Sequence, residues 1–308
     1  MNKEFYSNGK LLITAEYLVL DGANALALPT KFGQTLVVES IVQEMVVWES
    51  FDVSNNCWFQ AEFRLNDLRI VSETFDATSE DPKESIALTL SDILLKARDM
   101  NPSFLQKGCH VKTRLNFPRN WGLGTSSTLI NNIASWAGID AFKLLWNSFG
   151  GSGYDIACAQ NNTPIIFSNF NKVPKVNQVT FNPSFKEHLY FVHLNIKQDS
   201  KKGIARYRQK EFDIDKALRQ VNQLTKEFES AKTIEDFEQL VNEHEALISS
   251  IIGNKPVKEV LFADYPGAIK SLGAWGGDFV LVTGDKNTPA YFKSKGFETV
   301  LPFDEMIL

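Results

Sequence analysis

A run of alternating apolar and polar residues constrains the fold of this chain most strongly. In Phe59–Leu65 every second residue is apolar, which is the period of a half-buried strand. Further strand-like stretches fill Thr35–Phe75 and are separated by polar turns such as Asn55-Asn56. The pattern predicts an antiparallel meander in this part of the chain.

Helical spacing begins after the meander and alternates with further strands. A Thr-x-x-Asp capping pattern at Thr233–Asp236 predicts the start of a long helix, which an apolar stripe continues to Ile251. His244 flanks this stripe and is interpreted as structural. Further helices are predicted at Pro82–Met100, Thr128–Ala137, around Leu218–Leu224, at Pro266–Leu272 and at Pro289–Lys295, and further strands at Cys109–Phe117, Leu189–Leu194, Phe279–Thr283 and Phe297–Leu301.

Composition excludes several classes of protein. The 308 residues suffice for one large domain or two modest ones, and a polar stretch at Asn169–Ser184 is the expected boundary. With 44% hydrophobic and 22% charged residues, the chain is in the globular range and is not expected to be disordered. A net charge of −5 argues against nucleic acid or an anionic membrane as a partner.

The cysteines and the hydropathy pattern bear on location. Cys57, Cys109 and Cys158 are scattered and odd in number, which predicts a reducing compartment and therefore a cytoplasmic protein. No stretch approaches the roughly 20 apolar residues of a membrane helix, and no His/Cys spacing predicts zinc.

A glycine–hydroxyl loop, Gly122–Ser127, stands between a predicted strand and a predicted helix. Glycines allow close approach of the backbone to a ligand, and a helix start offers free N–H groups to phosphate. A plain strand-to-helix turn with Ser/Thr caps is the alternative. The loop is not a P-loop, since no GxxxxGK[ST] occurs, and Ser127 replaces the third glycine of a Rossmann dinucleotide fingerprint.

Two other glycine turns could carry chemistry. Asp155 follows the turn Gly150–Gly153 and is a candidate base, with an Asx turn before a buried segment as the alternative. Gly273–Gly277 precedes the strand predicted at Phe279, and a tight turn is its alternative. Neither turn identifies a function by itself.

Four motifs in a fixed order together resemble one enzyme family. They are Gly9-Lys10 followed by Glu16-Tyr17, the GLGTSS loop at Gly122–Ser127, SGYD at Ser152–Asp155 and GAWGGD at Gly273–Asp278. This order resembles the GHMP small-molecule kinases, named for galacto-, homoserine, mevalonate and phosphomevalonate kinases. The resemblance extends from Lys10 to Phe279, and its most specific part is the GLGTSS loop, close to the family form PxxxGLGSSA.

Details of the motifs indicate which members of the family the chain resembles most. Glu16-Tyr17 is most similar to phosphomevalonate kinases, since mevalonate kinases tend to carry Glu-His there. The GYDIA run at Gly153–Ala157 is similar to a hallmark of a bacterial kinase-like subgroup. The resemblance implies an α+β fold with two domains, an ATP-binding domain over residues 1–175 and a ferredoxin-like C-terminal domain over residues 176–308.

The resemblance also implies cofactors and site residues. ATP and Mg²⁺ are the implied cofactors, with Asp155 as the base that takes the acceptor's proton and Lys10 close to the transferred phosphoryl group. The ATP phosphates are expected on Gly122, Leu123, Gly124, Thr125, Ser126 and Ser127, and the Ser126 hydroxyl is also expected to meet the metal. Substrate-binding residues are expected at Glu16, Tyr17, Ser152, Gly153, Lys201, Gly273, Ala274, Gly276 and Gly277.

The implied function is transfer of the γ-phosphoryl group of ATP to a small hydroxyl or phosphate acceptor of the mevalonate or phosphomevalonate type. If the acceptor already carries a phosphate, a cation should hold it, and the candidates are Ser200, Lys201 and Lys202, with a solvated charge run as the alternative. The oligomeric state is left open, with a homodimer as one alternative.

Two departures from the family keep a second function open. Phe142–Phe149 contains no acid where mevalonate kinases place a metal-binding glutamate, and Trp121 and Trp275 stand where the family has small residues. Either tryptophan could stack on a base, fill a pocket or pack. A nucleotide or metabolite binder of weak or absent activity is therefore the alternative on the same fold, and a Rossmann dehydrogenase ranks lower.

Overall fold

The computed structural model describes residues 2–75, 85–196 and 200–308, which form two compact units. Unit 1 comprises Met1–Gly9, Phe32–Arg119 and Gly124–Gln160, and unit 2 comprises Lys10–Lys31, Asn120–Leu123 and Asn161–Leu308. Strands β1 (Lys3–Leu12) and β2 (Ala25–Ser40) supply residues to both. The predicted domain ranges, 1–175 and 176–308, stay a prediction.

Unit 1 contains a sheet in the order β5-β4-β3-β6-β2, with β1 also paired to β2. Its other strands are β3 (Met45–Phe51), β4 (Cys57–Arg64), β5 (Ile70–Phe75) and β6 (Cys109–Leu115). The predicted meander is confirmed for β3 to β5, which pair in sequence order and antiparallel. Between β2 and β3, however, the sheet takes in β6, which runs parallel to β3.

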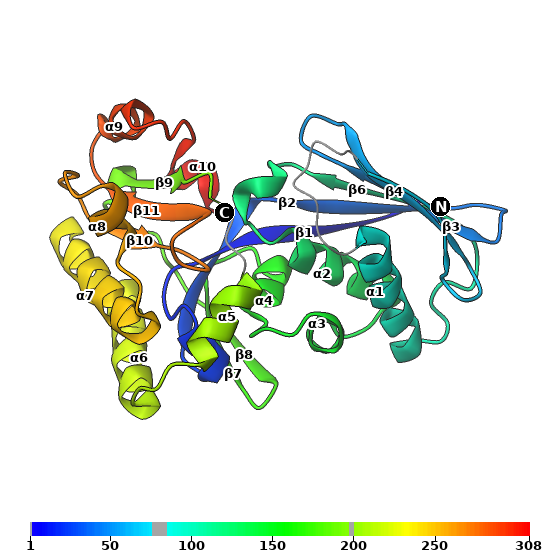
Figure 1. The fold of residues 1–308 in the computed structure, drawn as a ribbon, viewed down its shortest axis with the longest axis horizontal. Coiled ribbons are helices and arrows are strands. Elements are labelled where there is room, and N and C mark those ends of the chain that lie inside the picture. Colours follow the sequence, from blue (N-terminus) through cyan, green and yellow to red (C-terminus); the bar gives the residue numbers. More distant parts are fainter. Residues whose placement is uncertain (1, 76–84, 197–199) are drawn as a thin grey trace. The chain divides into compact units, whose positions relative to one another are not determined.

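Four helices cover one face of this sheet (Figure 1). They are α1 (Ile86–Met100), α2 (Thr125–Ala137), α3 (Ala141–Ser148) and α4 (Tyr154–Gln160). The sheet and helices share one core, to which Trp48, Phe63 and Leu94 belong. Helix α1 begins at Ile86, later than predicted, because the Ser85 side chain caps it, and Pro82 lies outside the described residues.

The first strands of unit 2 form a hairpin on β2. Strand β7 (Ile165–Phe170) pairs with Ala25–Ala27 of β2 and with β8 (Val173–Gln178). Short 3₁₀ helices occur at Leu18–Asp21 and Lys186–His188 in unit 2, and at Arg119–Trp121, where unit 1 ends at Arg119 and unit 2 continues from Asn120.

The second sheet of unit 2 has the order β10-β11-β9-β12, with every pair antiparallel. Its strands are β9 (Leu189–His193), β10 (Ile269–Ser271), β11 (Phe279–Thr283) and β12 (Val300–Pro302). Helices lie between β9 and β10 and between β11 and β12, so the succession is β-α-β-β-α-β. This succession and strand order are those of a ferredoxin-like domain, which confirms the prediction.

The helices of unit 2 are α5 (Ser200–Arg208), α6 (Ile214–Ser230), α7 (Ile234–Ile252), α8 (Val257–Leu261), α9 (Thr288–Ser294) and α10 (Phe303–Met306). The predicted cap at Thr233 is confirmed, because its hydroxyl accepts from the N–H of Asp236 at 3.1 Å. The helix predicted at Pro266–Leu272 is wrong, since its end forms β10, paired along its whole length with β11. None of the described helices is both long and apolar enough to cross a bilayer.

The alternation of side chains along β10 places Lys270 on a defined face of the sheet. Ile269 lies opposite Val282 and packs in the core with Phe262 and Phe292, which belong to the segments around α8 and α9. Lys270 therefore points to the other face, where its ammonium reaches Glu245 of α7. A charged residue is thus buried on an edge strand of a ferredoxin-like sheet, on the face that packs against α7.

Candidate functional site

The loop predicted to bind phosphate begins helix α2 in unit 1. Gly124 is the N-cap residue with φ 94°, and Thr125–Ser127 form the first turn of the helix, three residues earlier than predicted. A glycine cap has no side chain to accept from the first-turn N–H groups, and these groups carry the positive end of the helix dipole. The Ser126 side chain is exposed, whereas the buried Ser127 hydroxyl donates to the Gly124 carbonyl at 2.9 Å. The helix start therefore has the chemistry of an anion site.

In unit 2 the first two residues of the same loop are held by Lys10. The Lys10 ammonium donates to the Gly122 carbonyl at 2.8 Å, and the Lys10 N–H donates to the Leu123 carbonyl at 3.0 Å. The structure thus brings together the predicted catalytic lysine and two of the predicted phosphate-binding residues.

The carboxylate of Asp278 lies beside Gly122 in unit 2. No role is predicted for Asp278 from the sequence. A Cβ built on Gly122, which has φ 65°, would lie 2.2 Å from Cγ of Asp278. The Asp278 backbone is itself at φ 52° and is held by hydrogen bonds to Leu194 and Ile196. Only glycine at position 122 therefore leaves room for this carboxylate.

Replacing Gly122 by alanine is expected to destabilise unit 2 by about 1–3 kcal/mol, because a Cβ meets both a positive φ and the Asp278 carboxylate. The matched control is Gly138→Ala, since Gly138 has φ 66° but no atom within 4 Å of a Cβ. Urea unfolding of both variants separates the cost of φ from that of the overlap. Equal losses would show that the Asp278 contact contributes nothing.

Asp155 lies in the first turn of α4 in unit 1. Gly153, at φ 98°, ends the predicted glycine turn, and the segment that follows it is a helix. A carboxylate in a first turn is stabilised by the helix dipole, and the side chain of Asp155 is half-buried. Helix α4 packs on α2, and Gln160 donates to Asn131 of α2 at 2.9 Å. The helices that carry the predicted base and the predicted phosphate site are thus joined within unit 1.

The late glycine loop, Gly273–Gly277, lies in unit 2 with Tyr17. The Tyr17 hydroxyl donates to the Ala274 carbonyl at 2.7 Å, which joins two predicted substrate-binding residues. Tyr17 also stacks on Tyr207 of α5, with ring centroids 5.5 Å apart. Lys201 is in the first turn of α5, and its side chain lies outside the described part of the chain.

Trp121, just before the first glycine loop, and Trp275, within the late one, both make contacts in unit 2. Trp275 is 3% exposed, and its indole N–H donates to Glu245 at 3.3 Å. Trp121 lies edge-on to Phe279 of β11, with centroids 5.4 Å apart. Of the alternatives left open by the sequence, packing therefore accounts for the buried Trp275.

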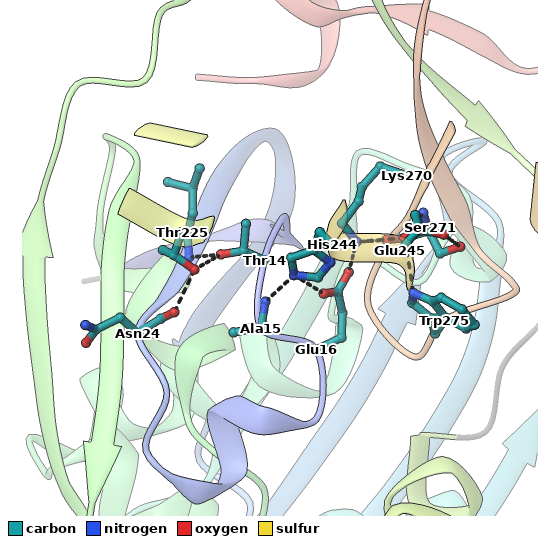
Figure 2. Close-up of polar contacts among 11 residues, drawn as sticks. Thr14, Ala15, Glu16, Asn24, Thr225, His244, Glu245, Lys270, Ser271 and Trp275 are labelled. Carbon is teal, nitrogen blue, oxygen red and sulfur yellow. Dashed lines mark hydrogen bonds and ion pairs between the residues drawn. The ribbon is translucent and has the colours of Figure 1, made fainter. Parts of the chain in front are cut away.

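A fully buried cluster of charged residues supports the first motif and the glycine loop from within unit 2 (Figure 2). Lys270 forms an ion pair with Glu16 and a second with Glu245, the latter at 3.2 Å. The Nε2 atom of His244 lies 3.4 Å from Glu16 and accepts the N–H of Ala15 at 3.0 Å. Glu16, a predicted substrate-binding residue, is thus 0% exposed and engaged by protein groups.

Burial is the largest cause of the pKa shifts in this cluster. It raises the pKa of Glu16 to about 7 although Lys270 acts in the opposite direction, and it raises the pKa of Glu245 as well. Burial, and next the charge of Lys270, lowers the pKa of His244 well below its usual value. His244 is therefore neutral, in agreement with its interpretation as structural, and two carboxyl groups share one ammonium.

Comparison with known proteins identifies solved structures that share the fold of this chain. No protein-family model and no curated sequence matches the chain. Solved structures with the same fold include the mevalonate kinase of Methanococcus jannaschii, with a TM-score of 0.67 and 13% identity over 97% of this chain and 96% of that chain. The phosphomevalonate kinase of Streptococcus pneumoniae in complex with phosphomevalonate and AMPPNP has a TM-score of 0.65 and 16% identity, over 95% of both chains.

A galactokinase is similar to the same extent. The Lactococcus lactis enzyme complexed with galactose has a TM-score of 0.66 and 13% identity, over 96% of this chain and 89% of that chain. The chain therefore has the fold of these small-molecule kinases. This confirms the predicted α+β fold, and it confirms the resemblance to the GHMP kinases at the level of the fold.

Proposed function

We propose that the protein is an ATP-dependent small-molecule kinase, which transfers the γ-phosphoryl group to a hydroxyl or phosphate acceptor. The observation that supports this function most strongly is the pairing of α2 and α4 within unit 1. One helix has a glycine-capped start suited to phosphate, and the other carries a carboxylate in its first turn.

Phosphoryl transfer needs positioning and neutralisation of charge more than covalent catalysis. In this proposal the N–H groups at the start of α2 bind phosphate oxygens, and Asp155 accepts the proton of the acceptor hydroxyl. Lys10 supplies positive charge beside Gly122, where its ammonium already donates to the backbone. Glu16 has a supporting role in place of direct contact with substrate, because its carboxylate is enclosed.

The residues at the start of α2 fit ATP and a divalent cation. The exposed Ser126 hydroxyl is an oxygen ligand of the kind that Mg²⁺ prefers. No group of three His, Cys, Asp or Glu side chains that could hold a metal occurs in the ranges 2–75, 85–196 and 200–308. We therefore propose that Ser126, the nucleotide and water hold Mg²⁺, which on binding would neutralise phosphate charge.

An acceptor of the mevalonate or phosphomevalonate type is the proposed substrate class. Glu16-Tyr17 in the first motif supports it, as do two neighbours in fold, a mevalonate kinase and a phosphomevalonate kinase. A cytoplasmic location and a homodimer stay predictions.

A nucleotide or metabolite binder of weak activity is the second candidate. It is favoured by α3, whose residues Ala141–Ser148 include no carboxylate that could assist a metal. The two candidates share binding of ATP and differ in turnover.

Mg-ATP is expected to raise the thermal midpoint of the protein, whereas NAD(H) is expected to leave it unchanged. At a ligand concentration about 100 times Kd the stabilisation amounts to about 2.7 kcal/mol. Ser126→Ala should reduce the part of the shift that depends on Mg²⁺, and Ser135→Ala, an exposed position on the same helix, should not. Stabilisation by NAD(H) alone would end the kinase proposal.

A further inference from the structure

Glu245 of α7 accepts three hydrogen bonds from one short segment of unit 2. Its carboxylate accepts the Ser271 N–H at 3.0 Å, the Ser271 hydroxyl at 2.8 Å and the Trp275 indole N–H at 3.3 Å (Figure 2). Glu245 is 4% exposed, so a hydrogen bond lost here would not be replaced by one to water.

The two donor residues stand on either side of the turn into the late glycine loop. Ser271 ends β10, and Trp275 lies inside Gly273–Gly277, where its backbone N–H donates to the Leu272 carbonyl at 3.2 Å. Trp275 has φ 61°, a conformation that persists in a non-glycine residue only where surrounding contacts hold it. A single carboxylate thus holds both ends of a strained turn.

The Glu245 carboxylate is itself paired with a buried cation. The Lys270 ammonium is 3.2 Å from Glu245 and also pairs with Glu16. The next residue, Tyr17, donates its hydroxyl to the Ala274 carbonyl at 2.7 Å. Contacts from α7, β10 and the first motif therefore converge on the loop.

We propose that Glu245 is a positioning residue, which holds the late glycine loop in its ligand-binding shape before any ligand binds. That the loop serves a bound substrate or nucleotide rests on the proposed kinase function. The dependence of the loop's shape on Glu245 is independent of that function. Glu245 does not contact the ligand itself and acts on the loop through its hydrogen bonds with Ser271 and Trp275.

The test is fluorine NMR of protein labelled with 5-fluorotryptophan, with the Trp275 resonance assigned by its loss in Trp275→Phe. In the ligand-free protein, Glu245→Gln is expected to shift and broaden this resonance, because an amide cannot accept from all the donors that the carboxylate satisfies. Glu243→Gln is the matched control, since Glu243 is an exposed residue of α7 bonded to Gln239.

Kinetics supply a readout that a merely structural role would not move. Per folded molecule, Glu245→Gln is expected to lower kcat/KM by about 10- to 100-fold through misplacement of the loop. Ser271→Ala, which removes one hydrogen bond and no charge, should lower it about 2- to 10-fold. Ser271→Ala also provides the test if Glu245→Gln does not fold.

The outcomes separate this proposal from the proposed function. A Trp275 resonance that responds to Glu245→Gln in a protein without kinase turnover would support the positioning of the loop and contradict the kinase. An unchanged resonance in Glu245→Gln or, if that variant does not fold, in Ser271→Ala would overturn the positioning role, whatever the turnover of the wild type.

Discussion

Lys270→Met is expected to destabilise unit 2 by about 3–5 kcal/mol, which is the usual cost of removing one partner from a buried ion pair. Lys270 is 0% exposed, and its ammonium pairs with both Glu16 and Glu245. Methionine fills a similar volume but leaves two buried carboxyl groups without a cation. The thermal midpoint of unit 2 should fall on the order of 10 °C, which calorimetry measures directly.

The loss should depend on pH with a definite sign. Because burial raises the pKa of Glu16 from 4.5 to about 7, the folded state binds a proton more tightly than the unfolded state. The stability of the wild type therefore falls as the pH rises from about 5 to above 7. Lys270 opposes this trend, since it lowers the pKa of Glu16. The deficit of Lys270→Met should accordingly be smaller near pH 5 than near pH 8.

Two further variants isolate the buried pair as the cause. Lys295→Met removes a lysine that is 40% exposed from its pair with Asp264, and should cost far less stability than Lys270→Met because solvent screens this pair. Adding Glu16→Gln to Lys270→Met removes one of the orphaned carboxyl groups and should restore part of the loss. If Lys270→Met is as stable as the wild type at both pH values, the cluster does not stabilise unit 2.

Asp155→Asn is expected to lower kcat by about 100-fold or more, with little change in KM. An amide keeps the shape of the side chain but cannot take the proton of the acceptor hydroxyl, and general base catalysis contributes about 10²- to 10⁴-fold. Asp155 is suited to this role because the first turn of α4 holds it half-buried next to α2. Steady-state rates at saturating Mg-ATP measure the effect.

Asp92→Asn is the matched control in the same unit. Asp92 is exposed on α1 and pairs with Lys96 one turn away, so its replacement should leave the rate unchanged. If the turnover number of Asp155→Asn equals that of the wild type, Asp155 is not the base.

The elements with a strong periodic signal were predictable from the sequence. The strand at Phe279–Thr283 has the predicted bounds, and the helix capped by Thr233 begins where predicted. The strands β3 to β5 follow from their alternation. The insertion of β6 between β2 and β3 was not predictable, because pairing of distant strands leaves no local signal.

The error at Pro266–Leu272 has a local cause. Strand β10 has three residues, too few to display an alternation, and a lysine in its centre conceals a fully buried strand. Pairing with β11 and the ion pairs of Lys270 decide the conformation there. Tertiary contacts thus outweigh the local preference for helix after a proline.

In the candidate site, the glycine motifs identified the loops but not their supports. Glu245 and the neutral His244 stand at positions that continue the apolar stripe of α7, between Val241 and Ile248. Two polar residues within a buried helical stripe are a signal that could have predicted a buried polar cluster. Lys270 and Glu16 as its partners, and Asp278 beside Gly122, come from distant parts of the chain and needed the structure.

Transfer of the γ-phosphoryl group from ATP is tested most directly by detection of the phosphorylated product. The protein would be incubated with Mg-ATP and, in turn, mevalonate, phosphomevalonate, homoserine and sugar alcohols. ADP release would be followed together with phosphorus NMR of the acceptor. We predict that one acceptor gains a phosphoryl group in proportion to the ADP formed, and that Asp155→Asn loses about 100-fold of this rate. Tight binding of Mg-ATP with no phosphorylated product from any acceptor would contradict the kinase and leave a nucleotide binder.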